Sequence, residues 1–118
     1  MLARHLAGKP KAIAYIYRAF LGAVRNCGPV KVLPEKSRIA FQVRMSFAQL
    51  TPRRHWIDGH LVLAEPTPAP CIRKIERISQ RNHIHFFRLT SVDDITPELC
   101  SLMRQAYAVG DQQHLLRR

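Results

Sequence analysis

The feature of this sequence that most restricts its fold is an alternation of side chains across residues 36–47. One set of alternate positions is largely apolar: Ser37, Ile39, Phe41, Val43, Met45 and Phe47. The other set is polar and basic: Lys36, Arg38, Ala40, Gln42, Arg44 and Ser46. Successive side chains of a β-strand point to opposite faces, so the pattern predicts a strand with one buried and one solvated face. Such one-sided burial is typical of antiparallel sheets. Because the run is longer than most strands, we expect it to bend or bulge.

Further strands are expected on both sides of this run. Residues 30–33 form a short apolar segment before it, and residues 83–89 alternate after it, with Arg88 opposite Phe87 and Leu89. Residues 71–79 fit a helix by their isoleucine spacing, but their β-branched content and the polar turn that follows favour a strand. Residues 55–64 also alternate, with Ile57, Leu61 and Leu63 on one face and Trp56, Asp58, His60 and Val62 on the other. A stiff proline-rich loop is expected at residues 65–70.

Two helices are expected at the ends of the chain. The first covers residues 11–27, whose apolar side chains fall at helical spacing: Ile13, Ile16, Tyr17, Phe20, Val24 and Cys27. Gly28 followed by Pro29 predicts its end, with the glycine as a left-handed cap. The second helix follows Thr96, a suitable N-cap, and Pro97, which fits the first helical position. Gly110 can end this helix.

These elements predict a single α+β domain covering residues 1–118. A chain of 118 residues suits one domain with one core. We expect a two-layer sandwich, in which an antiparallel sheet of four to five strands carries the N- and C-terminal helices on one face. The other face of the sheet is then left open to solvent.

The charge of the chain is large and unevenly distributed. Nineteen Lys and Arg stand against eight Asp and Glu, giving a formal net charge of +11. Residues 1–54 hold eleven of the basic residues and a single acid, Glu35, whereas residues 55–118 hold eight basic and seven acidic residues. A positive surface attracts anionic partners, such as nucleic acid, anionic lipid or an acidic protein, and it also keeps a protein in solution by self-repulsion.

The predicted open face gathers the residues that such a partner would contact. We expect the binding residues to be Lys36, Arg38, Gln42, Arg44, Arg53, Arg54, Trp56 and His60. Arginines on alternate strand positions can bind phosphates, and a tryptophan on the next strand can stack on a base. The leading hypothesis is therefore a binding module for nucleic acid. The alternatives are a plainly solvated sheet face, and a protein-interaction or dimerisation domain that uses this face, which leaves a homodimer open.

No motif in the sequence requires an enzyme, a cofactor or a metal. Glycine-rich phosphate loops and a Gly-flanked serine elbow are absent, and we assign structural roles to the three cysteines. His83 and His85 would share one strand face, where His55 or His60 could join them around a metal. A hydrogen-bonded core histidine is the simpler interpretation of His85. With no secretory pattern and no apolar run long enough for a membrane span, we expect a cytoplasmic protein.

Several segments together resemble a family of small bacterial domains of unknown function. The resemblance rests on Gly28-Pro29-Val30, residues 36–42 with Arg44 and Phe47, residues 85–89, Asp93-Asp94, Ala106-Tyr107, Gly110 and His114-Leu115. It covers roughly residues 6 to 116. It implies a cytoplasmic bacterial setting and supplies no catalytic residues. Arg53-Arg54 matches an arginine-rich segment of the family, whereas the proline-rich loop and His83 depart from its pattern.

Overall fold

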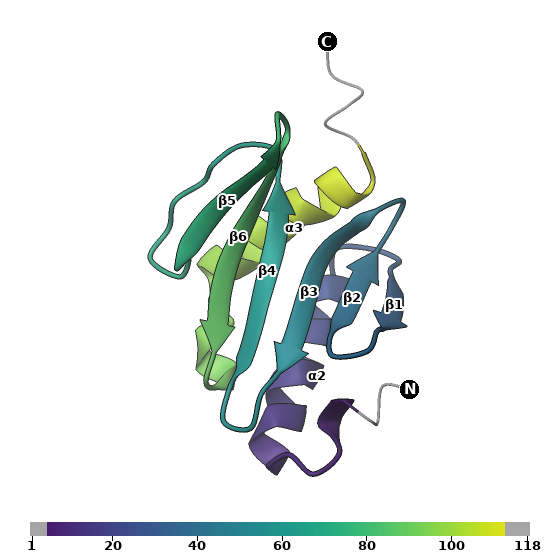
Figure 1. The fold of residues 1–118 in the computed structure, drawn as a ribbon, viewed down its shortest axis with the longest axis vertical. Coiled ribbons are helices and arrows are strands. Elements are labelled where there is room, and N and C mark those ends of the chain that lie inside the picture. Colours follow the sequence, from purple (N-terminus) through teal and green to yellow (C-terminus); the bar gives the residue numbers. More distant parts are fainter. Residues whose placement is uncertain (1–4, 113–118) are drawn as a thin grey trace.

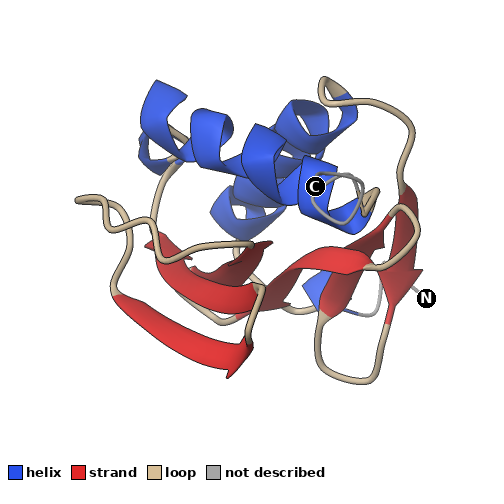
Figure 2. Cartoon of the chain, turned by 90° about the horizontal axis from the view of Figure 1, so that it is seen from above, coloured by secondary structure: helices blue, strands red, loops and turns tan. Residues whose placement is uncertain are grey.

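The chain folds into one antiparallel sheet with two helices packed on one of its faces (Figures 1 and 2). This arrangement is seen in a computed structural model that describes residues 5–112. The elements are, in chain order, α2 (Lys11–Arg25), β1 (Lys31–Pro34), β2 (Ile39–Gln42), β3 (Ser46–Pro52), β4 (Ile57–Leu63), β5 (Lys74–Ser79), β6 (Asn82–Leu89), a 3-10 turn η1 (Val92–Asp94) and α3 (Pro97–Gly110). Within residues 5–112, neither helix is long and apolar enough to cross a bilayer.

The predicted α+β architecture is confirmed, but the sheet has six strands instead of four to five. Their order is β1-β2-β3-β4-β6-β5, and all neighbours are antiparallel. The strand assigned to residues 71–79 is present as β5, although it begins only at Lys74. The sheet therefore consists of a meander from β1 to β4, followed by a hairpin that inserts β6 beside β4 and leaves β5 at the edge.

The prediction of one long strand over residues 36–47 is wrong, because the run is a hairpin. β2 ends at Gln42, a turn spans residues 43–45, and β3 begins at Ser46. The backbone N–H groups of Arg44 and Met45 both donate to the carbonyl of Gly110, at 2.9 and 3.0 Å. The end of α3 thus holds the turn in place. The expected irregularity is also present, as a register shift between Phe41 and Gln42.

Helix α2 ends two residues earlier than the sequence predicts, at Arg25. Gly28 then has φ of 146°, a conformation that favours glycine. A Cβ at this position would lie 2.5 Å from the hydroxyl oxygen of Tyr107, which donates a hydrogen bond to the Pro29 carbonyl at 2.7 Å. Gly28 therefore lets the chain leave α2 directly against α3.

Helix α3 begins as the sequence predicts. The Thr96 hydroxyl accepts a hydrogen bond from the N–H of Leu99 at 3.1 Å, and Pro97 is the first helical residue. At the other end, the left-handed residue is Gln112, with φ of 59°. Gly110 instead allows a close approach, since a Cβ there would lie 2.6 Å from the Phe47 ring. Gly110 is therefore needed for its lack of a side chain, which lets the end of α3 pack directly against Phe47 of β3.

The core lies between the helices and the sheet (Figure 2). Alternate residues of β4 and β6 are buried on this helix face, as the alternation predicts. Gly59 of β4 is among them, and a Cβ added to it would lie 2.6 Å from the ring of Phe87 on β6. The other set of alternate residues forms the open face of the sheet.

Candidate functional site

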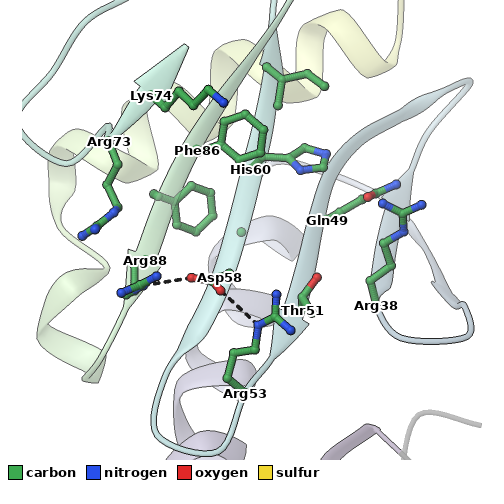
Figure 3. A pocket seen from close by; sticks show the side chains of 13 residues that line it. Arg38, Gln49, Thr51, Arg53, Asp58, His60, Arg73, Lys74, Phe86 and Arg88 are labelled. Carbon is green, nitrogen blue, oxygen red and sulfur yellow. Dashed lines mark hydrogen bonds and ion pairs between the residues drawn. The ribbon is translucent and has the colours of Figure 1, made fainter. Parts of the chain in front are cut away.

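A groove of about 610 Å³ runs over the open face, across β3, β4, β6 and the start of β5 (Figure 3). Five cationic side chains line it: Arg38, Arg53, Arg73, Lys74 and Arg88. Its remaining polar and aromatic lining consists of Gln49, Thr51, Asp58, His60 and Phe86 together with buried Phe87. A volume in this range is typical of ligand sites in proteins.

The strand register explains how these residues meet. Asp58 of β4 pairs with Thr51 on one side and with Arg88 on the other, which gives a first row across the sheet. A second row consists of Gln49, His60, Phe86 and Lys74, each on a neighbouring strand. Directly paired side chains on one face of an antiparallel sheet are close enough to interact. The two rows form the floor of the groove.

The first row is an ion-pair network centred on Asp58. Its Oδ2 accepts a hydrogen bond from Nε of Arg53 at 3.0 Å, and its Oδ1 accepts one from Nε of Arg88 at 2.9 Å (Figure 3). Partial burial alone would raise the pKa of Asp58, but its polar contacts with Arg88, Trp56 and Arg53 outweigh burial, and the pKa lies below its ordinary value. The guanidinium of Arg88 also stacks on Trp56, with Cζ 4.6 Å from the ring centroid.

The second row places an uncharged histidine beside an aromatic ring. Burial, with a further contribution from the charge of Arg38, lowers the pKa of His60 from 6.5 to about 4. The imidazole is therefore neutral at pH 7. Its ring contacts Phe86 edge to face, with centroids 5.6 Å apart, and the Lys74 ammonium lies 5.7 Å from the centroid of Phe86.

The groove has a net positive charge, because its single acid is shared by two of its five cations. Two other cations have acidic partners outside the groove: Arg38 lies 3.5 Å from Glu35, and Lys74 lies 3.0 Å from Glu76. These side chains are about half exposed, and such pairs compete weakly with solvent and ligands. Arg73 is also exposed, and its guanidinium has no partner within residues 5–112.

The structure brings together only some of the residues proposed from the sequence. Arg38, Arg53 and His60 line the groove, and Trp56 lies against Arg88 at its end. The others are placed elsewhere. Arg44 occupies the β2–β3 turn and pairs with Asp111 at 3.2 Å. Gln42 ends β2 opposite Ser46, and Arg54 is exposed in the β3–β4 turn. Lys36 lines a smaller cavity beside Arg53. The expectation that Lys36, Arg38, Gln42 and Arg44 share one strand face is wrong because the run is a hairpin.

Most of the groove residues were not proposed as binding residues from the sequence, and the cationic and aromatic ones among them on the open face are Arg73, Lys74, Phe86 and Arg88. The alternation of residues 83–89 carries a signal for two of them, since it places Phe86 and Arg88 together on the face opposite Phe87. Arg73 and Lys74 carry no such signal. They reach the groove because β5 pairs with β6, which the local pattern does not reveal.

His83 and His85 do not lie on the same face of the sheet as His60. His83 and His85 face the helices, whereas His60 lies on the open face. His85 is the core histidine that the sequence favours: its Nε2 accepts a hydrogen bond from the Thr67 N–H, and its Nδ1 donates to the His83 carbonyl, both at 2.9 Å. Within residues 5–112, no three His, Cys, Asp or Glu side chains are grouped as metal ligands.

The three cysteines are free thiols and partly buried. Burial raises the pKa of the Cys27 and Cys71 thiols, which disfavours the reactive thiolate. Cys27 and Cys71 also pack against the hydrophobic core. Cys27 and Cys71 therefore contribute to packing.

Fold and groove together define a class of small α+β domain whose helices cover one sheet face and whose open face carries a cationic groove. Comparison with family models identifies the family: residues 3–110 match the domain of unknown function DUF5655, and the chain belongs to it. No curated protein and no solved structure matches the sequence. The resemblance to a domain-of-unknown-function family is thus confirmed, although His114-Leu115, which contributed to it, lie outside the described residues.

Proposed function

We propose that this protein is a binding module that holds single-stranded nucleic acid in the groove of its open sheet face. The observation that carries the proposal is the composition of that groove: five cationic side chains surround a floor that contains Phe86 and the neutral ring of His60. Cations along a groove neutralise phosphates, and flat rings on its floor offer stacking surfaces for bases.

The placement of the rings favours a single strand over a duplex. Phe86 and His60 lie on the floor between the cations, so a base must leave its stack to reach them (Figure 3). Bases of a loop or single strand can do this, whereas those of a duplex are paired and stacked. Stacking tolerates every base, and we therefore expect weak sequence preference.

The cations should make binding strongly dependent on salt. Each phosphate that a protein neutralises on a single strand contributes a slope of about −0.7 to the plot of log affinity against log salt. If three or four of the five lining cations contact phosphates, we expect a slope of about −2 to −3. A contact made mainly through apolar protein surface would show little dependence on salt.

The test is fluorescence anisotropy with labelled single- and double-stranded oligonucleotides of random sequence, titrated at several salt concentrations. The informative variant is Arg38→Ala/Arg73→Ala, which removes two exposed cations of the groove. Its matched control is Lys11→Ala/Arg18→Ala, which removes the same charge from the exposed side of α2. We expect the first variant to lose about ten-fold or more in affinity for the single strand and to show a shallower salt slope, with the control near wild type.

Two results would contradict the proposal. Equal losses in the two variants would mean that net charge, rather than the groove, attracts the oligonucleotide. No binding at low salt would exclude nucleic acid as the ligand of the groove. Light scattering would then examine the alternative of protein contact, since a concentration-dependent and salt-resistant dimer indicates that the open face binds a second copy.

A further inference from the structure

Asp58 is placed so that it fixes the orientation of two arginines in the groove. Its two carboxylate oxygens accept hydrogen bonds from the Nε atoms of Arg53 and Arg88, one each. Arg53 comes from the β3–β4 turn and Arg88 from β6. The Asp58 carboxylate on β4 therefore contacts side chains from both sides of its strand. The two guanidinium groups lie on either side of Asp58 (Figure 3).

These contacts leave the outer part of each guanidinium available. An arginine carries N–H donors on Nε and on both terminal nitrogens. Only Nε of Arg53 and Nε of Arg88 are used toward Asp58, and the terminal nitrogens make no other hydrogen bond within residues 5–112. Guanidinium forks of this kind match the geometry of phosphate oxygens.

Arg88 is held by a second contact, its stacking on Trp56. Its side chain is 35% exposed, compared with 54% for Arg53, so one arginine is fixed and the other is freer. Arg88 and Asp58 are partly buried and Arg53 is exposed, and ion pairs at such positions contribute modestly to the stability of a fold. The network's cost in ordering two long side chains is better explained if it prepares them for a ligand.

We propose that Arg53, Asp58 and Arg88 form a phosphate clamp, in which the arginines bind the oxygens of one phosphoryl group and Asp58 is the positioning residue. The clamp rests on the proposed function and makes it more specific. The phosphoryl group lies at the first row of the groove, and the second row, with His60 and Phe86, receives the adjoining base. The ligand unit of this site is thus a nucleotide whose phosphate is directed to the clamp.

The variant Asp58→Asn separates this proposal from simple charge attraction. It removes a negative charge from the groove, and charge attraction alone predicts tighter binding of any anion. The clamp predicts the opposite. The asparagine amide has one oxygen acceptor and one NH₂ donor, so it can hold only one of the arginines and repels the N–H groups of the other. We expect Asp58→Asn to weaken binding about three- to ten-fold.

A second pair of variants keeps every charge. Arg88→Lys preserves the cation but loses the planar fork and the stacking on Trp56, and we expect about a five-fold loss of affinity. Arg18→Lys is its matched control, because Arg18 is an exposed arginine of α2 that lies outside the groove. We expect this variant to bind like the wild type. Equal thermal unfolding of all three variants and the wild type establishes that folding is not the cause.

The probe is inorganic phosphate, titrated at constant ionic strength and followed by the emission of Trp56, the only tryptophan of the chain. Because this ring lies against Arg88, occupation of the clamp should change its emission in a saturable way. We expect the response with phosphate, a much weaker one with chloride, and a right-shifted curve for Asp58→Asn. A linear response, or tighter binding by Asp58→Asn, would overturn the clamp.

The same variants assayed with a single-stranded oligonucleotide distinguish the two proposals. If the oligonucleotide binds but Asp58→Asn tightens it, the clamp fails and the binding function stands. If the oligonucleotide does not bind while phosphate gives a saturable signal sensitive to Asp58→Asn, the clamp stands and its ligand is a smaller phosphorylated molecule. A 5′-phosphorylated oligonucleotide compared with its 5′-hydroxyl form tells whether the clamp takes a terminal phosphate or an internal phosphodiester.

Discussion

The two faces of the sheet treat the same residue type in opposite ways. His85, on the helix face, has both ring nitrogens in hydrogen bonds, one to the Thr67 N–H and one to the His83 carbonyl. His60, on the open face, makes no hydrogen bond within residues 5–112, and burial keeps its ring neutral. On the helix face, His85 therefore serves the fold by holding the proline-rich loop through Thr67. On the open face, the ring of His60 is left available for a ligand.

The largest changes in stability and in oligonucleotide affinity should come from substitutions of the two adjacent phenylalanines of β6. Phe87 faces the helices, is 2% exposed and stacks on Phe20 with centroids 5.8 Å apart. We expect Phe87→Ala to lower the free energy of unfolding by about 3–5 kcal/mol. Phe86→Ala, on the open face, should cost less than about 1 kcal/mol and instead weaken oligonucleotide binding about ten-fold. Urea denaturation and anisotropy measure the two quantities, and similar stabilities for both variants would refute the assignment of faces.

A smaller effect is expected from the two glycines that can be compared directly. Gly59→Ala places a Cβ 2.6 Å from the Phe87 ring and 2.9 Å from Leu50, and overpacking of this kind costs about 1–3 kcal/mol. Gly22 is exposed in α2 with no atom within 4 Å of the added Cβ, so Gly22→Ala should stabilise the protein by about 0.5–1 kcal/mol. Thermal denaturation distinguishes the opposite signs, and destabilisation by both would contradict this packing.

The histidines also predict how stability depends on pH. The unfolded chain protonates His60 near pH 6.5, whereas the folded chain resists protonation until about pH 4, because the ring is buried and near Arg38. The pKa of His85 is likewise lowered by burial. Unfolding takes up protons in this window. The free energy of unfolding is therefore highest above about pH 6.5 and decreases as the pH falls toward 4.

We expect a loss of about 1–2 kcal/mol between pH 7 and pH 4.5, less than the full shift implies because His60 is partly exposed. Urea titrations across this range measure it, and His60→Gln should flatten part of the curve. A stability that rises on acidification would show that these rings are protonated in the folded protein.

The smallest change in oligonucleotide affinity is expected on substitution of Arg44, which the sequence pattern places among the binding residues. The structure puts it in the β2–β3 turn, paired with Asp111 and outside the groove. Arg44→Ala should therefore change oligonucleotide affinity by less than about two-fold, whereas Arg38→Ala lowers it several-fold. Anisotropy at low salt measures both. Equal losses would return Arg44 to the binding surface and weaken the case for the groove.

Arg44 also illustrates why part of the fold was not predictable. Residues 43–45 contain no Gly, Pro, Asn or Asp, the usual signals of a turn, and the apolar alternation continues through them. The turn depends instead on the hydrogen bonds from Arg44 and Met45 to the Gly110 carbonyl. Such a contact, between residues distant in sequence, is invisible to local periodicity. The helix starts and the strands at β4 and β6 were predictable because their signals are local.

The same division applies to the site. Alternation placed His60 and Asp58 on the open face, and Arg53 was expected at the turn next to that strand. In the sheet, β4 lies between β3 and β6, and β5 lies on the outer side of β6 although it comes before β6 in the chain. Lys74 and Arg73 therefore enter the groove through strand order, which no single segment encodes.

The most direct test of the account is to map the oligonucleotide on the two faces by amide chemical shifts. Single-stranded oligonucleotide is titrated into ¹⁵N-labelled protein at moderate salt. We expect chemical-shift changes concentrated in β3, β4, β6 and the start of β5, around Asp58, His60, Phe86 and Lys74, and no change at the exposed basic residues of α2. Shifts of equal size at Lys11, Arg18 and Arg25 would contradict it, because the oligonucleotide would then follow net charge and not the groove.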